Sequence, residues 1–296
     1  MTPEFGAIAA AIADARGSRV AAVSATPVGG GSIHRAWRLD IGDERFFVKT
    51  NALTAAPMFA AEARGLQAIA QIGVLPAPTF ITLGQTDADA FLVLEHLDLK
   101  PLDQGSGRQL GAALARLHQA SAESYGWSEN NFIGATPQDN TPHPSWPRFF
   151  GEHRLRPQLL LAQAKGMDTS LVAKGLAVIE RAGGLFIDYR PAPSLLHGDL
   201  WSGNAAQIEN SGPVVFDPAC YYGDRETDLA MAELFGGFPT SFYAAYREAW
   251  PLDSGYERRK PLYNLYHILN HFNLFGDAYL GQARRMIEAL LAMLRR

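Results

Sequence analysis

The pattern of apolar residues changes near residue 97, and this change limits the folds that the chain can adopt. Before it, short apolar runs separated by turn-forming residues predict strands, with one helix among them. After it, apolar residues recur at helical spacing, as at Leu110, Ala113, Leu114 and Leu117. A β-rich part followed by a mainly helical part predicts an α+β fold with two lobes and a cleft between them.

The expected elements follow from turns and prolines. Pro57 suits the first turn of a helix that ends near Gln71. The expected strands are residues 20–27, 33–40, 45–50, 79–83 and 91–95. In the second part we expect a linker at 98–101, an ordered loop at 127–147, helices to about 182, a short strand and loop at 194–217, and helices thereafter. We therefore predict a domain of residues 1–96 and a domain of residues 97–296.

Composition excludes several classes of protein. A net charge of -4 and a pI near 6.1 argue against a general nucleic-acid-binding role, which favours a basic face. Cys220 is the single cysteine in the sequence, so no intrachain disulfide or cysteine-based metal cluster can form, which fits a reducing compartment. The sequence has neither a signal-peptide pattern nor an apolar stretch long enough to span a membrane. We expect a cytoplasmic protein without nucleic-acid or membrane partners; its oligomeric state stays open.

The residues from His197 to Asp217 carry the strongest chemical signal. His197, Asp199 and Asn204 match the H-x-D-x-x-x-x-N pattern of a kinase catalytic loop. Asp217 follows an apolar run thirteen residues after Asn204, where such a loop needs a second metal ligand. Taken alone, each residue could be an ordinary loop-former or strand cap. Together, in this order after a β-rich part, they predict Asp199 as a catalytic base and Asn204 and Asp217 as Mg²⁺ ligands for bound ATP.

Upstream residues extend this prediction. Lys49 ends an expected strand and lies thirteen residues before Glu62 in the expected helix, an arrangement that positions the phosphates of ATP in protein kinases. Backbone N–H groups of the turn at Gly30, Gly31 and Ser32 could contact phosphates, although this turn is neither a Walker A sequence nor a complete G-x-G-x-x-G.

The segment between the two lobes is expected to bind the adenine. Glu95, His96 and Leu97 follow the last expected strand of the first lobe. Backbone groups of Glu95 and Leu97 could bond the adenine edge, so we count all three residues as nucleotide-binding.

The sequence resembles the fructosamine/ketosamine-3-kinase family. The run H-G-D-L-W-S-G-N at His197–Asn204 is similar to the signature of that family. The resemblance continues through D-P-A at 217–219, Y-G-D-R-E-T-D-L-A-M at 222–231, L-F-G-G-F at 234–238 and L-N-H-F-N-L-F-G at 269–276, and so covers most of the chain. Some family members carry a cysteine in the glycine-rich loop where this chain has Ser32, so a redox switch based on that thiol is not expected.

The resemblance implies a protein-kinase-like fold and a reaction. Members transfer the γ-phosphate of ATP to the 3-hydroxyl of a ketosamine, a sugar-amine adduct that is small or protein-bound, and the product sheds its sugar, which amounts to deglycation. By this analogy Asp199 is the base, Asn204 and Asp217 hold Mg²⁺, and Lys49 pairs with Glu62. Trp201 and His271 are candidates for substrate binding.

Alternatives stay open at this point. Trp201 could instead anchor the core, and His271 could be a structural histidine. The acceptor could be an aminoglycoside, choline or an amino-alcohol, on the same fold. A non-catalytic nucleotide-binding protein is a third hypothesis, although such proteins usually lack the Lys, the base or a metal ligand.

Overall fold

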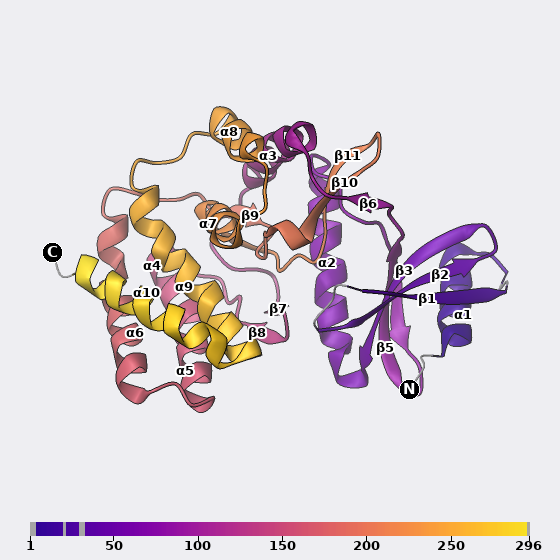
Figure 1. Ribbon diagram of the computed structural model, residues 1–296, viewed down its shortest axis with the longest axis horizontal. Coiled ribbons are helices and arrows are strands. Elements are labelled where there is room, and N and C mark those ends of the chain that lie inside the picture. Colours follow the sequence, from indigo (N-terminus) through magenta and orange to yellow (C-terminus); the bar gives the residue numbers. More distant parts are fainter. Residues whose placement is uncertain (1–3, 20–21, 30–32, 295–296) are drawn as a thin grey trace.

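The computed structural model describes residues 4–19, 22–29 and 33–294. Figure 1 shows a lobe built on an antiparallel sheet beside a larger, mainly helical lobe, with both ends of the chain at the outside of the molecule. This arrangement is the two-lobed α+β fold that the apolar pattern predicts. Gly30, Gly31 and Ser32, the predicted phosphate-binding turn, lie outside the described residues.

The first lobe is organised around a five-stranded sheet in the described part of the chain, with the strand order β1-β2-β3-β5-β4. Every neighbouring pair is antiparallel. Its strands are β1 (Val23–Val28), β2 (Arg35–Ile41), β3 (Glu44–Ala52), β4 (Phe80–Gln85) and β5 (Asp89–Glu95). The sheet is covered by α1 (Phe5–Arg16) on one face and α2 (Ala56–Ile72) on the other.

Burial on both faces explains the uninterrupted apolar run of β5. Phe91 and Val93 pack with Ile8 and Ile12 of α1. Ala90, Leu92 and Leu94 pack on the opposite face in the cluster that includes Phe59 and Leu66 of α2. Successive side chains of a strand point to opposite faces, so a strand between two helices has no polar face.

The five strands and α2 form close to their predicted positions, and α1 is the element that the prediction misses. Its sequence is rich in alanine, so the apolar stripe that marks a core-facing helix is weak. The predicted 1–96 and 97–296 division stays a prediction. The sheet ends with Glu95 of β5, and the following strand, β6 (Leu99–Lys100), pairs with β10 of the helical lobe.

The helical lobe is assembled around α9 (Tyr256–Phe275), which contacts α5, α7 and α10. An Asp103–Ser106 capping box begins α3 (Gln104–His118), which lies along α8. The other helices of eight or more residues are α5 (Arg156–Ala164), α6 (Thr169–Arg181), α7 (Glu226–Phe235), α8 (Thr240–Ala249) and α10 (Leu280–Met293). A short α4 (Trp146–Phe149) leads into a π-helical segment, 150–155.

Short strands interrupt the helical lobe in segments where the sequence predicts a loop (127–147), a short strand and loop (194–217) and helices (after 217). A hairpin of β7 (Asn131–Ile133) and β8 (Thr136–Gln138) forms inside the expected loop 127–147. The expected strand and loop at 194–217 contains β9 (Ser194–Leu196), β10 (Ala205–Ile208) and β11 (Gly212–Val215). A later strand, β12 (Tyr221–Gly223), pairs with β9. These strands hold the segments that carry the predicted site.

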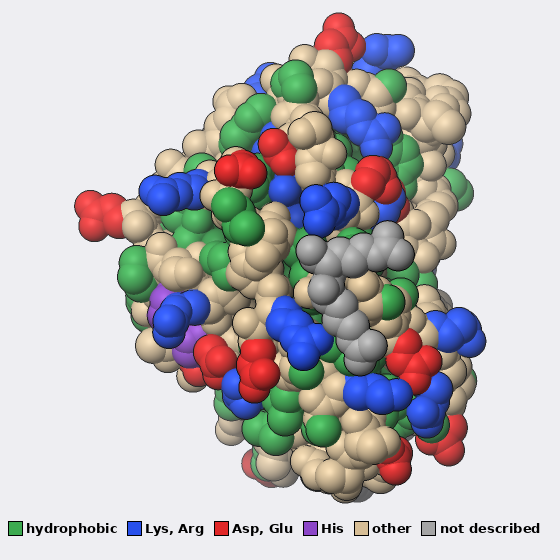
Figure 2. All heavy atoms as spheres, turned by 90° about the vertical axis from the view of Figure 1, so that its left-hand side faces the viewer, with side chains coloured by type: hydrophobic (Ala, Val, Ile, Leu, Met, Phe, Trp, Pro, Cys, Tyr) green, Lys and Arg blue, Asp and Glu red, His purple; other side chains and the backbone are tan. Residues whose placement is uncertain are grey.

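Figure 2 shows the end of the helical lobe, where basic and acidic side chains are interspersed. In this lobe Lys174 of α6 and Glu288 of α10 form an ion pair at 3.0 Å. The face in view therefore carries no extended region of one charge. Among the described residues, no helix combines the length and apolar character needed to cross a membrane.

Candidate active site

A cavity of about 490 Å³ lies between the lobes and brings the predicted residues together. Lys49 and Glu62 enter it from the sheet lobe. Asp199, Asn204 and Asp217 enter it from the helical lobe. The structure thus joins residues separated by up to 168 positions in the sequence.

Lys49 stands at the centre of this charged group. Its Nζ donates to Glu62 Oε1 at 2.8 Å and to Asp217 Oδ1 at 2.5 Å. Burial opposes the charged ammonium, but the two carboxylates raise the pKa of Lys49 above its ordinary value, so it stays cationic. The pair predicted for Lys49 and Glu62 is therefore formed, and Lys49 also links the two lobes.

The loop after β9 presents Asp199. Gly198 has φ +83°, and a Cβ atom there would come within 2.1 Å of the Ala219 carbonyl oxygen, so glycine is required between the histidine and the aspartate. Asn204 donates through Nδ2 to the Asp199 carbonyl at 2.9 Å and to Asp199 Oδ2 at 3.2 Å. The amide nitrogen of Asn204 is therefore committed to Asp199, and its amide oxygen is the atom left for a cation.

The Asp199 carboxyl group has a perturbed affinity for protons. Burial, the negative charge of Asp217 and, more weakly, that of Asp228 outweigh the Asn204 hydrogen bond and raise the pKa of Asp199 to about 7. A carboxylate with this pKa is a stronger base than an exposed aspartate, which suits a group that accepts a proton near neutral pH.

The turn that carries Asp217 is joined to the same loop. Asp217 adopts a left-handed backbone conformation, φ +57°, which is uncommon for a non-glycine residue and often found at functional sites. The imidazole of His197 holds both segments: Nε2 donates to the Phe216 carbonyl at 3.0 Å, and Nδ1 accepts from the Asp199 N–H at 3.3 Å. His197 therefore positions both Asp199 and Asp217.

Asp228, on α7, holds the backbone of the catalytic loop. Its Oδ2 accepts from the His197 N–H at 2.7 Å, and its Oδ1 accepts from the Gly198 N–H at 2.9 Å. A third donor, His118 Nε2, lies 3.1 Å from Oδ2. Burial works against the carboxylate, but these donors hold the pKa of Asp228 below its ordinary value, so the group is ionised.

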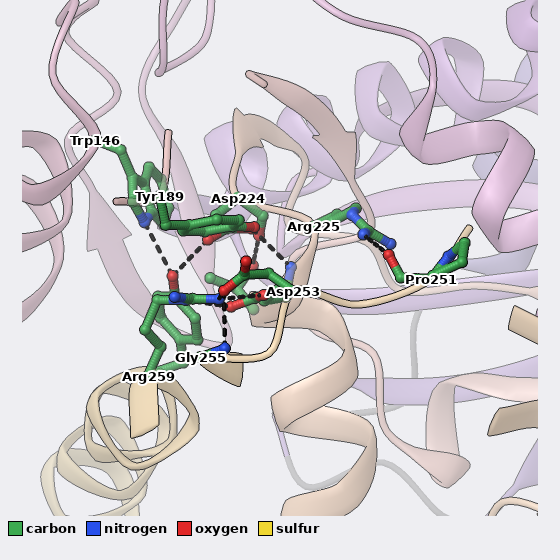
Figure 3. Close-up of polar contacts among 11 residues, drawn as sticks. Trp146, Tyr189, Asp224, Arg225, Pro251, Asp253, Gly255 and Arg259 are labelled. Atoms are coloured by element: carbon green, nitrogen blue, oxygen red, sulfur yellow. Dashed lines mark hydrogen bonds and ion pairs between the residues drawn. The ribbon is translucent and has the colours of Figure 1, made fainter. Parts of the chain in front are cut away.

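A second polar network anchors the N-terminal end of α7, as Figure 3 shows. Asp224 accepts from the Tyr263 hydroxyl at 2.5 Å and from the Tyr189 hydroxyl at 3.0 Å. Arg259 of α9 forms two 2.8 Å bonds with the buried carboxylate of Glu226. The helix that carries Asp228 is thereby fixed to α9 by charged and hydroxyl groups.

The predicted adenine-binding segment lines the cavity only in part. Glu95 and Leu97 contribute to the wall, together with Phe47 and Leu94. The Glu95 N–H already donates to Thr79 at 2.9 Å, so it is not available to a nucleotide. The side chain of His96 does not belong to the wall of described residues and lies near Asp98 instead, so that part of the prediction is not supported by the geometry.

Both predicted substrate-binding residues line the cavity. Trp201 is 40% exposed, and its ring lies so close to Gly203 that a side chain there would collide with it. His271 packs between Phe235 and Phe275, with ring centroids at 4.8 and 5.6 Å, and its Nδ1 lies 2.8 Å from the His267 carbonyl. An exposed tryptophan is not a core anchor, so that alternative for Trp201 does not hold.

Several wall residues were missed by sequence reasoning. The β7–β8 hairpin contributes Asn131, Phe132 and Gly134 to the cavity, and His34 enters it ahead of β2. A hairpin signal was present, because Gly134 follows an apolar pair, but nothing local indicates that the hairpin lies beside α2. His34 carries no motif of its own.

The oxygen donors suit a hard divalent cation. Asp217 offers a carboxylate, and Asn204 offers an amide oxygen, at the wall of one cavity. No group of three or more His, Cys, Asp or Glu side chains able to hold a metal occurs within the portion of the chain that the structure describes. Mg²⁺ needs no such group, because it is commonly held by one or two carboxylates and by substrate phosphates.

Comparison with known proteins identifies the family. The sequence profile of the fructosamine kinase family matches residues 4–293. The chain belongs to the fructosamine kinase family. It is 43% identical to a Vibrio cholerae protein named a probable ketoamine kinase, over 90% of this chain and 91% of that one. It is 41% identical to a chloroplastic protein-ribulosamine 3-kinase of Arabidopsis thaliana, over 90% and 82% of the two chains.

Solved structures support the same assignment. A protein of Haemophilus somnus assigned as a fructosamine-3-kinase superposes with a TM-score of 0.89 at 30% identity, over 96% of both chains. An aminoglycoside phosphotransferase superposes with a TM-score of 0.64 at 16% identity, over 96% of this chain and 98% of that one, which shows a shared fold. The predicted family, kinase class and protein-kinase-like fold are confirmed.

Proposed function

We propose that this fructosamine kinase family member transfers the γ-phosphoryl group of ATP to the 3-hydroxyl of a ketosamine. The observation that carries the proposal is the convergence of Lys49, Asp199 and Asp217 in one cavity between the lobes. Phosphoryl transfer needs an oriented hydroxyl, a proton acceptor and groups that stabilise charge on the phosphates, and this set can supply each of them.

The roles follow from the contacts. The oxygen of the acceptor hydroxyl bonds to the γ-phosphorus, and the bond between that phosphorus and ADP breaks. Asp199 accepts the proton that the hydroxyl loses. Lys49, held by Glu62, binds the phosphates. Asn204 and Asp217 fit a Mg²⁺ ion, which when bound neutralises charge on the phosphates. We assign the adenine to the end of the cavity near Glu95 and Leu97, and the ketosamine to the end near Trp201 and His271.

The ketosamine acceptor rests on family membership. The relatives carry ketoamine kinase names, and the Arabidopsis relative is named for protein-bound ribulosamine. We therefore include both small and protein-bound ketosamines in the proposal, with deglycation as the outcome. A cytoplasmic location, as expected from composition, belongs to the same proposal.

An acceptor panel tests the substrate. ATP consumption is measured with ribulosamine, erythrulosamine and fructosamine, each small and protein-bound, beside an aminoglycoside, choline and an amino-alcohol. We expect Mg²⁺-dependent turnover with at least one ketosamine. Turnover with another acceptor and none with any ketosamine would reverse the assignment.

A variant tests the base. Asp199→Asn removes the proton acceptor while keeping the shape of the side chain, and we expect turnover to fall by about 10²- to 10⁴-fold. Asp188→Asn, at an exposed aspartate, is the matched control and should leave turnover unchanged. An Asp199→Asn enzyme with near-normal turnover would refute the role of this residue.

A further inference from the structure

His34 lies beside Lys49 on the wall of the cavity, and none of the functions above uses it. Ala36 of β2 is opposite Lys49 of β3 in the strand register, and both line the cavity. Because side chains of a strand alternate between its faces, Asn51 of β3 lies on the same face as this pair, and its amide nitrogen is 2.9 Å from Nδ1 of His34, which precedes β2. His34 therefore faces the region where Lys49 would meet the phosphates.

Asn51 determines which nitrogen of His34 carries the proton. The Asn51 amide nitrogen donates to the Ile33 carbonyl at 3.0 Å, and the amide oxygen accepts from the Ala52 N–H at 2.8 Å. These two backbone partners have opposite polarity, so the amide can adopt one orientation only. Its second N–H then lies 2.9 Å from His34 Nδ1, which must accept. A neutral His34 therefore carries its proton on Nε2.

The surroundings keep this imidazole neutral and hold its plane. Burial, followed by the positive charge of Lys49, lowers the pKa of His34 to about 4, although Asp217 acts in the opposite direction. The ring contacts Phe59 of α2 at a centroid distance of 4.8 Å. Among the residues that the structure describes, none accepts a hydrogen bond from His34 Nε2, so this donor remains for a ligand.

We propose that His34 is a nucleotide-binding residue whose Nε2–H donates a hydrogen bond to a non-bridging oxygen of the β- or γ-phosphate of the triphosphate, and that Asn51 is the positioning residue that fixes its tautomer. Phosphate oxygens accept hydrogen bonds and donate none, so a ring with the opposite tautomer would repel them. A neutral donor also adds a bond without placing a second cation beside Lys49. This inference rests on the proposed function in one respect only, that a nucleoside triphosphate occupies the cavity.

Nucleotide binding without acceptor tests the contact. The affinities of the Mg²⁺ complex of β,γ-imido-ATP and of AMP are measured by calorimetry for the full chain and for His34→Leu. A hydrogen bond to a charged group corresponds to about tenfold to hundredfold in affinity, so His34→Leu should weaken binding of the ATP analogue by that factor and leave AMP binding nearly unchanged. Equal losses for both nucleotides, or no loss for either, would overturn the proposal.

Conservative variants separate a hydrogen bond from a structural role. The amide nitrogen of His34→Gln extends about as far as Nε2, whereas that of His34→Asn reaches only to the position of Nδ1. We expect His34→Gln to retain most of the affinity for the ATP analogue and His34→Asn to resemble His34→Leu. In turnover assays the weakened variants should show a higher KM for ATP and an unchanged KM for the ketosamine. His153→Gln is the control and should match the wild type, because His153 lies beside Asp139 and is not among the described residues that line the cavity.

The tautomer can also be observed directly in the wild-type protein, which keeps the proposal testable if His34→Leu or His34→Asn fails to fold. In ¹⁵N-labelled wild-type protein, long-range ¹H–¹⁵N correlation should show His34 protonated at Nε2 and not at Nδ1, with assignment from the spectrum of His34→Gln. The ATP analogue should shift the Nε2 signal, and AMP should not. A proton on Nδ1, or an Nε2 signal that the analogue leaves unmoved, would refute the proposal.

The two proposals fail separately. If no ketosamine is phosphorylated but the nucleotide affinities follow the expected pattern, the assignment of the acceptor is wrong and the role of His34 stands. If ketosamines are phosphorylated and His34→Leu binds the ATP analogue like the wild type, the role of His34 is wrong and the kinase assignment stands.

Discussion

Replacing Asp228 by Asn tests whether this buried carboxylate holds the catalytic loop. The substitution changes little volume, so its effect comes from the altered hydrogen bonds and from the lost negative charge. Asp228 is 1% exposed, and its side chain accepts from three donors, the N–H groups of His197 and Gly198 and the Nε2–H of His118. An amide offers one oxygen where the carboxylate offers two, so its NH₂ group must face at least one of these donors.

The expected loss of stability can be worked from these contacts. A buried donor left without an acceptor costs about 1–3 kcal/mol, and the bonds that remain lose about 1 kcal/mol in all because their acceptor is no longer charged. Asp228→Asn should therefore lower the free energy of unfolding by about 2–4 kcal/mol. Turnover should fall by about tenfold to hundredfold, because a displacement of the reacting groups by ~1 Å has that effect.

The pH dependence gives an independent check on the same residue. The folded protein lowers the pKa of Asp228 below the ordinary value of 3.8. A carboxyl group with a depressed pKa stabilises the protein above its ordinary pKa, and this contribution is lost as the pH falls through the folded-state pKa. The stability difference between wild type and Asp228→Asn should accordingly be full at pH 5–7 and shrink below about pH 4.

Urea unfolding at several pH values, with turnover at pH 7, measures these effects. Asp188→Asn, at an exposed aspartate, should behave like the wild type in both assays. A variant at Asp228 with unchanged stability would show that these hydrogen bonds do not hold the loop. Unchanged turnover despite lost stability would show that the loop keeps its geometry without them.

Two further substitutions probe the substrate wall and the anchor of α7. In Gly203→Ala the new Cβ would come within 2.1 Å of the Trp201 ring. We expect the displaced ring to raise the KM for the ketosamine by about twofold to tenfold and to leave the KM for ATP unchanged. In the control Gly183→Ala, where the new Cβ meets no neighbouring atom, both KM values should stay unchanged. Arg259→Met leaves the buried carboxylate of Glu226 in α7 unpaired and should lower the free energy of unfolding by about 3–5 kcal/mol. The control Arg258→Met, at an exposed neighbouring residue, should change the free energy of unfolding by less than about 0.5 kcal/mol. Similar denaturation curves for the two variants would contradict this reasoning.

Local signals account for most of the fold that could be predicted. The strands β1 to β5 and the helix α2 are bounded by turns and prolines, and those residues act on their immediate neighbours. The short strands of the helical lobe could not be found in this way. Lys100 of β6 pairs with Gln207 of β10, more than a hundred residues away, and two residues carry too little pattern to indicate a partner.

The predicted site residues likewise divide into those that local sequence indicates and those that it does not. Asp199, Asn204 and Asp217 lie close together in the sequence, so their spacing alone indicated that they meet. Of the three residues predicted to bind the adenine, Glu95 and Leu97 line the cavity, whereas His96 is not among its described wall residues. The spacing of motifs reports which backbone segments meet, but not which side chains turn toward the ligand.

In the segment 222–231, by contrast, the family pattern marks acidic residues that do not line the cavity. Of this stretch, Met231 lines the cavity, whereas Asp224, Glu226 and Asp228 are buried behind it and bonded to α9, to tyrosines and to the catalytic loop. Buried charges are costly unless each is paired, so a loop that is held by them has few alternative positions. A catalytic base needs this restriction, because phosphoryl transfer depends on position more than on covalent chemistry. If Asp199 is the base, as we propose, the acidic residues of this motif serve the reaction through it, by limiting where its carboxylate can lie.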